Sequence, residues 1–203
     1  MLNPNENVLI VGLGNVGDEY EHTRHNAGFD VIGDIASITG VSFKKGFNGF
    51  YTKISSLGDK DVFLLKPATF MNLSGKSVKP FLDFYKIPTE NMIVIQDDMD
   101  LDLGNVKAKI LKGDGGHRGI RSIVAETGQT DFIRIKVGIG HPQFKSDVVN
   151  FVLTRPQGTD LEAYSQGLHD AALLTLLITK NGYDKGSNMF YSQRDKKKKE
   201  LNA

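Results

Sequence analysis

Four polar residues have side chains suited to hydrolysis, and each lies at the end of a predicted strand or just before a predicted helix. They are Asn15, His25, Asn72 and Asp97. A histidine paired with an aspartate suits general-base catalysis, because the carboxylate fixes the imidazole tautomer while the free ring nitrogen takes a proton from water. No serine lies in a nucleophile-elbow sequence, which favours direct attack by activated water. Each residue also has a structural alternative as a helix cap, turn residue or surface side chain.

These residues meet only if the elements before them end at one edge of a sheet. The β-branched run 8–11 and the apolar run 92–95 are typical of buried central strands, and further strands are predicted at 50–54, 61–66, 106–111 and 132–139. Helices are predicted at 28–39, from after Asn72 to near Pro88, from about 119 to 127, and at 157–181. The pattern predicts an α/β fold, a single domain with a mixed, mostly parallel twisted sheet and helices on both faces. Ligands of such sheets bind at the carboxyl ends of the strands.

Composition limits the possible partners and compartments. The chain has 203 residues, with 25 basic and 24 acidic side chains and a net charge of +1, so any RNA-binding surface must be a local patch. It has no cysteine, which excludes disulfides and thiolate chemistry. The amino terminus does not resemble a signal peptide, and the longest apolar run, 171–178, is too short to cross a membrane. We expect a cytoplasmic protein with one domain at 1–191 and a basic, disordered tail at 192–203.

Three motifs that suggest cofactors or metals lack the context they need. Gly12, Gly14 and Gly17 spell G-x-G-x-x-G, but acidic residues follow where a pyrophosphate would bind. The run 74–77 resembles a P-loop without its first glycine, and 98–109 resembles an EF-hand loop without its glycine and final glutamate. The histidines are not at helical metal-ligand spacing. We therefore expect no cofactor and no metal.

Five motifs resemble, in order and spacing, those of the bacterial peptidyl-tRNA hydrolase family. They are VGLGNVGDEYEHTRHNAG, KPATFMNLSGKSV, DDMDLDLG, GGHRGIRSI and RIKVGIGHP. The resemblance runs from Val8 to the end of the last long helix. It implies a monomeric α/β enzyme that hydrolyses the ester between a peptide and the 3′ end of tRNA, without a metal.

The resemblance also implies roles for individual residues. His25 would be the catalytic histidine, Asp97 its supporting aspartate, and Asn15 and Asn72 the asparagines of the cleft. Tyr20 and Phe70 match positions that line the site for the peptide and the tRNA 3′ end. Arg118 stands where the family motif usually has an asparagine that takes part in substrate binding, so its role is open: it would meet phosphate or ribose, or oppose protonation of His25.

A local excess of basic residues independently favours RNA. Segment 104–121 contains five basic residues against Asp114 alone, within a nearly neutral protein, and Arg134, Lys136, His141 and Lys145 follow on the next predicted strand and loop. By position, Lys109 and Lys136 resemble the family's pair that grips the tRNA 5′ phosphate. The structural alternative is an ordinary solvated strand face.

Two other functions stay open from the sequence. A non-catalytic RNA-binding module on the same fold would keep the basic surface and lose hydrolysis, and intact Asn15, His25, Asn72 and Asp97 argue against it. A nicotinamide-dependent oxidoreductase is the third possibility, and it rests on the glycine motif alone.

Overall fold

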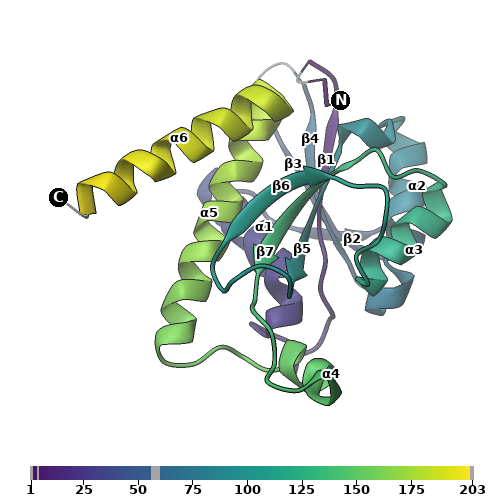
Figure 1. The fold of residues 1–203 in the computed structure, drawn as a ribbon. Coiled ribbons are helices and arrows are strands. Elements are labelled where there is room, and N and C mark those ends of the chain that lie inside the picture. Colours follow the sequence, from purple (N-terminus) through teal and green to yellow (C-terminus); the bar gives the residue numbers. More distant parts are fainter. Residues whose placement is uncertain (1, 4, 56–59, 202–203) are drawn as a thin grey trace.

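The protein folds around one mixed β-sheet (Figure 1). The structure is a computed structural model, and it describes residues 2–3, 5–55 and 60–201. Within those residues the sheet has 7 strands in the order β2-β3-β4-β1-β5-β7-β6. Strands β4, β1, β5 and β7 run parallel, whereas β2, β3 and β6 pair antiparallel at the two sides. The strand bounds are β1 Val8–Gly12, β2 Lys44–Gly46, β3 Gly49–Ile54, β4 Val62–Pro67, β5 Met92–Asp98, β6 Val106–Ile110 and β7 Ile133–Gly138. The predicted fold class is confirmed.

Helices cover both faces of the sheet (Figure 1). Helices α1 (Ala27–Thr39) and α5 (Thr159–Asn181) pack on one face, and α2 (Gly75–Tyr85) and α3 (Arg118–Thr127) pack on the other. The central strand supplies both cores, because its alternate residues point to opposite faces: Val8 and Ile10 join the first core, and Leu9 and Val11 join the second. This double burial explains why the sequence of β1 is continuously apolar.

The sequence did not predict two helices. One is the short α4 (Val148–Val152), which lies below the carboxyl ends of the strands in Figure 1. The other is α6 (Tyr183–Leu201), which projects away from the sheet. Among the described residues, none of the helices has the length and apolar character needed to cross a membrane.

We expected a disordered tail at 192–203, and in the structure residues 192–201 continue α6 as helix. Lysine and glutamate are good helix formers, and lysines near a helix carboxyl end interact favourably with its dipole. The first half of the helix is also attached to β6, because the Tyr183 hydroxyl donates to the Ala108 carbonyl (3.1 Å) and the Tyr191 hydroxyl accepts from the Ala108 N–H (3.2 Å). Residues 56–59 and 202–203 lie outside the described residues.

The first glycine of the G-x-G-x-x-G sequence serves packing. A Cβ added to Gly12 would lie 2.2 Å from the carbonyl oxygen of Gly28, at the start of α1. A Cβ on Gly28 would lie 2.3 Å from the Leu13 nitrogen and 2.5 Å from the Ile95 oxygen. The two glycines therefore allow the backbone of α1 to contact β1 and β5 directly, and this contact places the residues before α1 at the end of the sheet.

We predict that Gly28→Ala destabilises the protein by about 1–3 kcal/mol, because the new methyl group meets the backbone of β5 and of Leu13, the residue after β1. Gly113→Ala is the matched control, since an added Cβ there has no atom within 4 Å, and its effect should stay within about 0.5 kcal/mol. Urea unfolding followed by circular dichroism measures both. Equal midpoints for Gly28→Ala and the parent protein would contradict this account of the α1 contact.

Candidate active site

A cavity of about 480 Å³ lies at the carboxyl ends of β1 and β5 and contains most of the predicted site residues. Asn15, His25, Phe70, Asn72, Asp97 and Arg118 all line it. Tyr20, Lys109 and Lys136 are not among its lining residues. Part of the wall escaped the sequence analysis, namely Gln96, His117 and the α4 region (Val148, Val149, Val152, Leu153).

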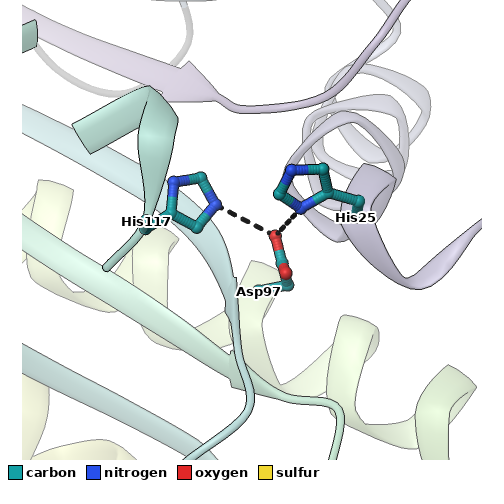
Figure 2. A group of neighbouring side chains, drawn as sticks. All are labelled: His25, Asp97 and His117. Carbon is teal, nitrogen blue, oxygen red and sulfur yellow. Dashed lines mark hydrogen bonds and ion pairs between the residues drawn. The ribbon is translucent and has the colours of Figure 1, made fainter. Parts of the chain in front are cut away.

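The centre of the site is one carboxylate oxygen shared by two histidines (Figure 2). Nδ1 of His25 lies 2.9 Å from Oδ1 of Asp97, and Nε2 of His117 lies 3.1 Å from the same oxygen. Three segments distant in sequence supply these residues. His25 lies in the 3-10 helix η1 (Arg24–Asn26) before α1, Asp97 lies in β5, and His117 immediately precedes α3. The predicted pairing of His25 with Asp97 is present in the structure.

His117 has both ring nitrogens occupied. Its Nδ1 accepts hydrogen bonds from the N–H groups of Gly119 (3.2 Å) and Ile120 (3.4 Å), so it caps the first turn of α3. An accepting Nδ1 leaves the proton on Nε2, which then donates to Asp97. His117 thus orients the carboxylate and has no nitrogen free to act on a ligand. The sequence could have indicated this capping role, because His117 follows two glycines and directly precedes the start of a helix.

His25 has the complementary arrangement. Asp97 is buried and accepts from Nδ1, so Nε2 of His25 is left with a free lone pair, and the side chain is 17% exposed beside the cavity. Burial lowers the pKa of His25, but the charge and hydrogen bond of Asp97 outweigh burial and leave the pKa above its usual value. Arg118 acts in the opposite direction and lowers this pKa. For Asp97, burial raises the pKa, yet the two histidines hold it well below its usual range, so the carboxylate stays ionised.

The segment that carries His25 is fixed by hydrogen bonds. The Thr23 hydroxyl donates to the Tyr20 carbonyl (2.8 Å), and the buried Tyr164 hydroxyl of α5 donates to the Thr23 carbonyl (3.3 Å). The Asn26 side chain accepts from the Asn15 N–H (2.8 Å) and donates to the Asn15 carbonyl (2.9 Å). These bonds hold the imidazole in place by fixing the backbone on both sides of it.

The same network orients the side chain of Asn15. Its Oδ1 accepts from the Met71 N–H at 3.2 Å. Because a backbone N–H needs an acceptor, this contact fixes the amide orientation and leaves the NH₂ of Asn15 as the group available to a ligand. Asn15 can therefore donate a hydrogen bond to a carbonyl in the cavity.

Asn72 and Phe70 also line the cavity, at the 3-10 helix η2 (Met71–Leu73) that leads into α2. Asn72 is not the N-cap of α2, since Ser74 occupies that position, and this removes its structural alternative as a helix cap. Both side chains are exposed, and Phe70 is 77% exposed despite its apolar ring. A large exposed aromatic ring at the edge of a cavity is suited to contact with a ligand.

The predicted basic surface is present only in part. Lys107 and Lys109 are exposed on edge strand β6, and the antiparallel register places them opposite Lys136 and Arg134 of β7. Arg134, which the sequence placed in this surface, is buried and donates to the carbonyls of Gly113 and Leu111, so it supports a loop and cannot contact phosphate. Lys136 is half-buried and ion-paired with Asp98.

His25, Asp97 and His117 are also the one group of the described residues close enough together to hold a metal, with ligand atoms within 4.8 Å. The hydrogen bonds do not fit this role. Coordination through Nε2 of His117 would move its proton to Nδ1, which would then oppose the N–H groups of Gly119 and Ile120. The cap of α3 therefore favours a protonated Nε2 and a hydrogen-bonded triad over a metal centre.

Comparison with known proteins finds relatives that match most of the length of this chain. Residues 9–200 match the family model described as "Peptidyl-tRNA hydrolase". A curated peptidyl-tRNA hydrolase of Clostridium novyi is 45% identical over 183 residues, which are 90% of this chain and 96% of the relative. One from Halalkalibacterium halodurans is 41% identical over 90% of this chain and 98% of its own. A crystal structure of the enzyme from Acinetobacter baumannii superposes with a TM-score of 0.86 at 35% identity, covering 94% and 96% of the two chains.

We predict that the titration of His25 responds in opposite directions to its two charged neighbours. Asp97→Asn should lower the pKa of His25, because the burial penalty remains while the stabilising charge is lost. Arg118→Ala should raise it, because an opposing cation is removed. NMR titration of the imidazole resonances measures both shifts, and the exposed His169 provides an internal control. A pKa of His25 that falls in Arg118→Ala would contradict the arrangement.

Proposed function

The chain belongs to the peptidyl-tRNA hydrolase family, and we propose that its His25–Asp97 pair activates the water that attacks the substrate. The protein is a hydrolase that acts on the ester bond of peptidyl-tRNA. The observation that carries the proposed mechanism is the 2.9 Å contact between Nδ1 of His25 and Asp97, because it leaves Nε2 free beside the cavity. A raised pKa suits a base that must accept a proton from water.

In the proposed reaction, Nε2 of His25 removes a proton from water as its oxygen attacks the ester carbonyl carbon. The resulting imidazolium is stabilised by Asp97, whose orientation depends on His117. The tetrahedral intermediate then collapses, the bond to the ribose oxygen breaks, and the proton on His25 passes to that oxygen. The products are tRNA with its terminal hydroxyl restored and a peptide carboxylic acid, which loses its proton to solvent.

We assign Asn15 to recognition of the N-blocked end. Its NH₂ can donate to a peptide carbonyl that a free aminoacyl-tRNA lacks, and an unmet buried polar group costs about 1–3 kcal/mol. Asn15→Ala should therefore narrow the rate ratio between N-acetyl-aminoacyl-tRNA and aminoacyl-tRNA in a release assay. An unchanged ratio would remove Asn15 from this role.

Two groups of residues are proposed for the remaining substrate contacts. Asn72 and the exposed ring of Phe70 line the cavity and suit the peptide and the 3′-terminal nucleotide. Tyr20 is assigned to the same region from the family motif, and its backbone supports Thr23. For the tRNA backbone, the exposed Lys109 and its neighbour Lys107 are better placed than Lys136, whose charge Asp98 already neutralises.

The alternatives are less well supported. A non-catalytic RNA-binding module would not need the oriented histidine pair around Asp97. A dinucleotide-dependent oxidoreductase has no support from the glycine sequence, since Gly12 contacts the backbone of Gly28.

We also propose that the protein is monomeric, cytoplasmic and independent of metal ions. Light scattering would test the monomer, cell fractionation the location, and dialysis against EDTA the metal independence.

We predict that His25→Ala lowers turnover by about 10²–10⁴-fold, the contribution expected of a general base. The side chain is partly exposed beside the cavity, so folding and tRNA binding should be retained. Peptide release from N-acetyl-aminoacyl-tRNA and tRNA binding are measured in parallel. His169→Ala, an exposed histidine of α5 outside the cavity, is the matched control. Parent-like turnover of His25→Ala would exclude the mechanism.

The basic surface gives a separate prediction about salt. Lys109→Gln should weaken tRNA binding and reduce the slope of log affinity against log salt by about 0.7–0.9, the value for one phosphate contact. Lys136→Gln should change the slope less, because its Asp98 partner already neutralises it. Arg118→Asn separates two roles: a reduced slope assigns Arg118 to phosphate, whereas a changed saturated rate with the slope unaltered assigns it to the cavity.

The matched control for these variants is Lys45→Gln. Lys45 is exposed on β2, at the opposite side of the same sheet, and its replacement changes net charge equally. Parent-like affinity and salt dependence in a combined Lys109, Lys136 and Arg118 variant would place the RNA surface elsewhere.

A further inference from the structure

The residue before the catalytic histidine connects the His25 segment to the apolar wall of the cavity. We infer that Arg24 is a positioning residue for peptide binding: it holds helix α4 beside His25, so that α4 forms the apolar wall against which the peptide part of the substrate packs. This inference rests on the proposed function.

Arg24 makes its contacts at the carboxyl end of α4. Its Nη1 donates to the hydroxyl (2.8 Å) and carbonyl (3.4 Å) of Thr154, and its own backbone N–H donates to the same carbonyl (3.1 Å). Its guanidinium lies 4.4 Å from the centre of the Phe151 ring, and Nη2 lies 3.4 Å from Asp160. The Thr154 hydroxyl donates in turn to the Phe151 carbonyl (2.8 Å). One buried side chain thus joins the His25 segment to the end of α4 and the start of α5.

Helix α4 needs such an attachment because its own residues give it little stability. It has five residues and none of them is buried. An isolated helix of this length is unstable in water, so contacts with the rest of the protein must hold it. Phe151 and Val152 pack only partly against the core. Arg155 adds a second attachment, since its side chain donates to the carbonyls of Glu21 (2.7 Å) and Asp18 (2.8 Å).

The apolar wall has a direct relation to the substrate. Val148, Val149, Val152 and Leu153 line the cavity that also contains His25. Val149 is 61% exposed, and with the three other residues it gives the cavity an apolar stretch of wall. Ribose and phosphate offer little apolar surface, whereas peptide side chains do, so this wall fits the peptide. Arginine suits the attachment because its planar group donates several hydrogen bonds and stacks on an aromatic ring, which lysine cannot reproduce.

The experiment measures the mobility of α4 and substrate kinetics in the same variants. The chain has no cysteine, so Asn150→Cys, an exposed position on α4 outside the cavity lining, takes a single spin label. Arg24→Met keeps the length of the side chain and removes its hydrogen bonds, Arg24→Lys keeps the charge, and Thr154→Val removes one acceptor. Unlabelled variants are assayed with N-acetyl-leucyl-tRNA and N-acetyl-glycyl-tRNA.

We expect faster label motion in Arg24→Met and a KM for the leucyl substrate raised about tenfold, with kcat changed less than about threefold. The glycyl substrate should be affected less, because it offers no side chain to the wall. Arg24→Lys and Thr154→Val should show smaller changes in the same direction, and they decide the question if Arg24→Met lowers the melting temperature too far.

Unchanged label motion would overturn the inference. A loss confined to kcat, equal for both substrates, would also overturn it and would assign Arg24 to the placement of His25. Failure of the proposed function is distinguishable, because a parent protein that releases no peptide still reports the motion of α4 through the label.

Discussion

The arrangement of the site depends on one buried carboxylate that accepts from two histidines. Asp97 stays ionised although it is buried, because both imidazoles direct N–H groups at the same oxygen. The two histidines differ in the contacts of their second ring nitrogen. Nδ1 of His117 accepts hydrogen bonds from the first turn of α3, whereas Nε2 of His25 is left free beside the cavity. A difference in backbone environment therefore gives two chemically identical side chains different roles, one that holds the carboxylate and one that can exchange a proton.

The rest of the fold can be understood as the support for that contact. Asp97 lies on β5, between the parallel strands β1 and β7 of the mixed sheet, so its position is fixed by apolar packing on both faces. His25 comes from a segment without regular strand or long helix, and it is held by the glycine contact of α1, the Asn15–Asn26 hydrogen bonds and the Tyr164 hydroxyl. The sheet thus fixes the position of Asp97, and hydrogen bonds make the irregular segment that carries His25 rigid.

The sequence predicted the central elements because their patterns are strong. Continuous apolar runs identified β1 and β5, and polar residues after them identified Asn15 and Asp97 as neighbours at one edge of the sheet. Contacts that depend on tertiary structure could not be predicted from the sequence. Nothing in the residue type of Arg134 shows that it is buried, and nothing in that of Lys136 shows that Asp98 lies beside it. The short α4 has no buried face to give a periodic pattern, and the lysine run of α6 resembles a disordered end unless its anchoring tyrosines are known.

Those tyrosines also occupy the outer edge of the sheet at β6. An outermost strand with free N–H and C=O groups is a template on which another chain can add a strand. At β6 the two groups of Ala108 are already bonded to the hydroxyls of Tyr183 and Tyr191, so the middle of that edge offers no pairing partner. The opposite edge, β2, is three residues long and carries two exposed lysines. Both edges of the sheet therefore disfavour the addition of another strand, β6 because side-chain hydroxyls take the place of a neighbouring strand and β2 because it is short and charged.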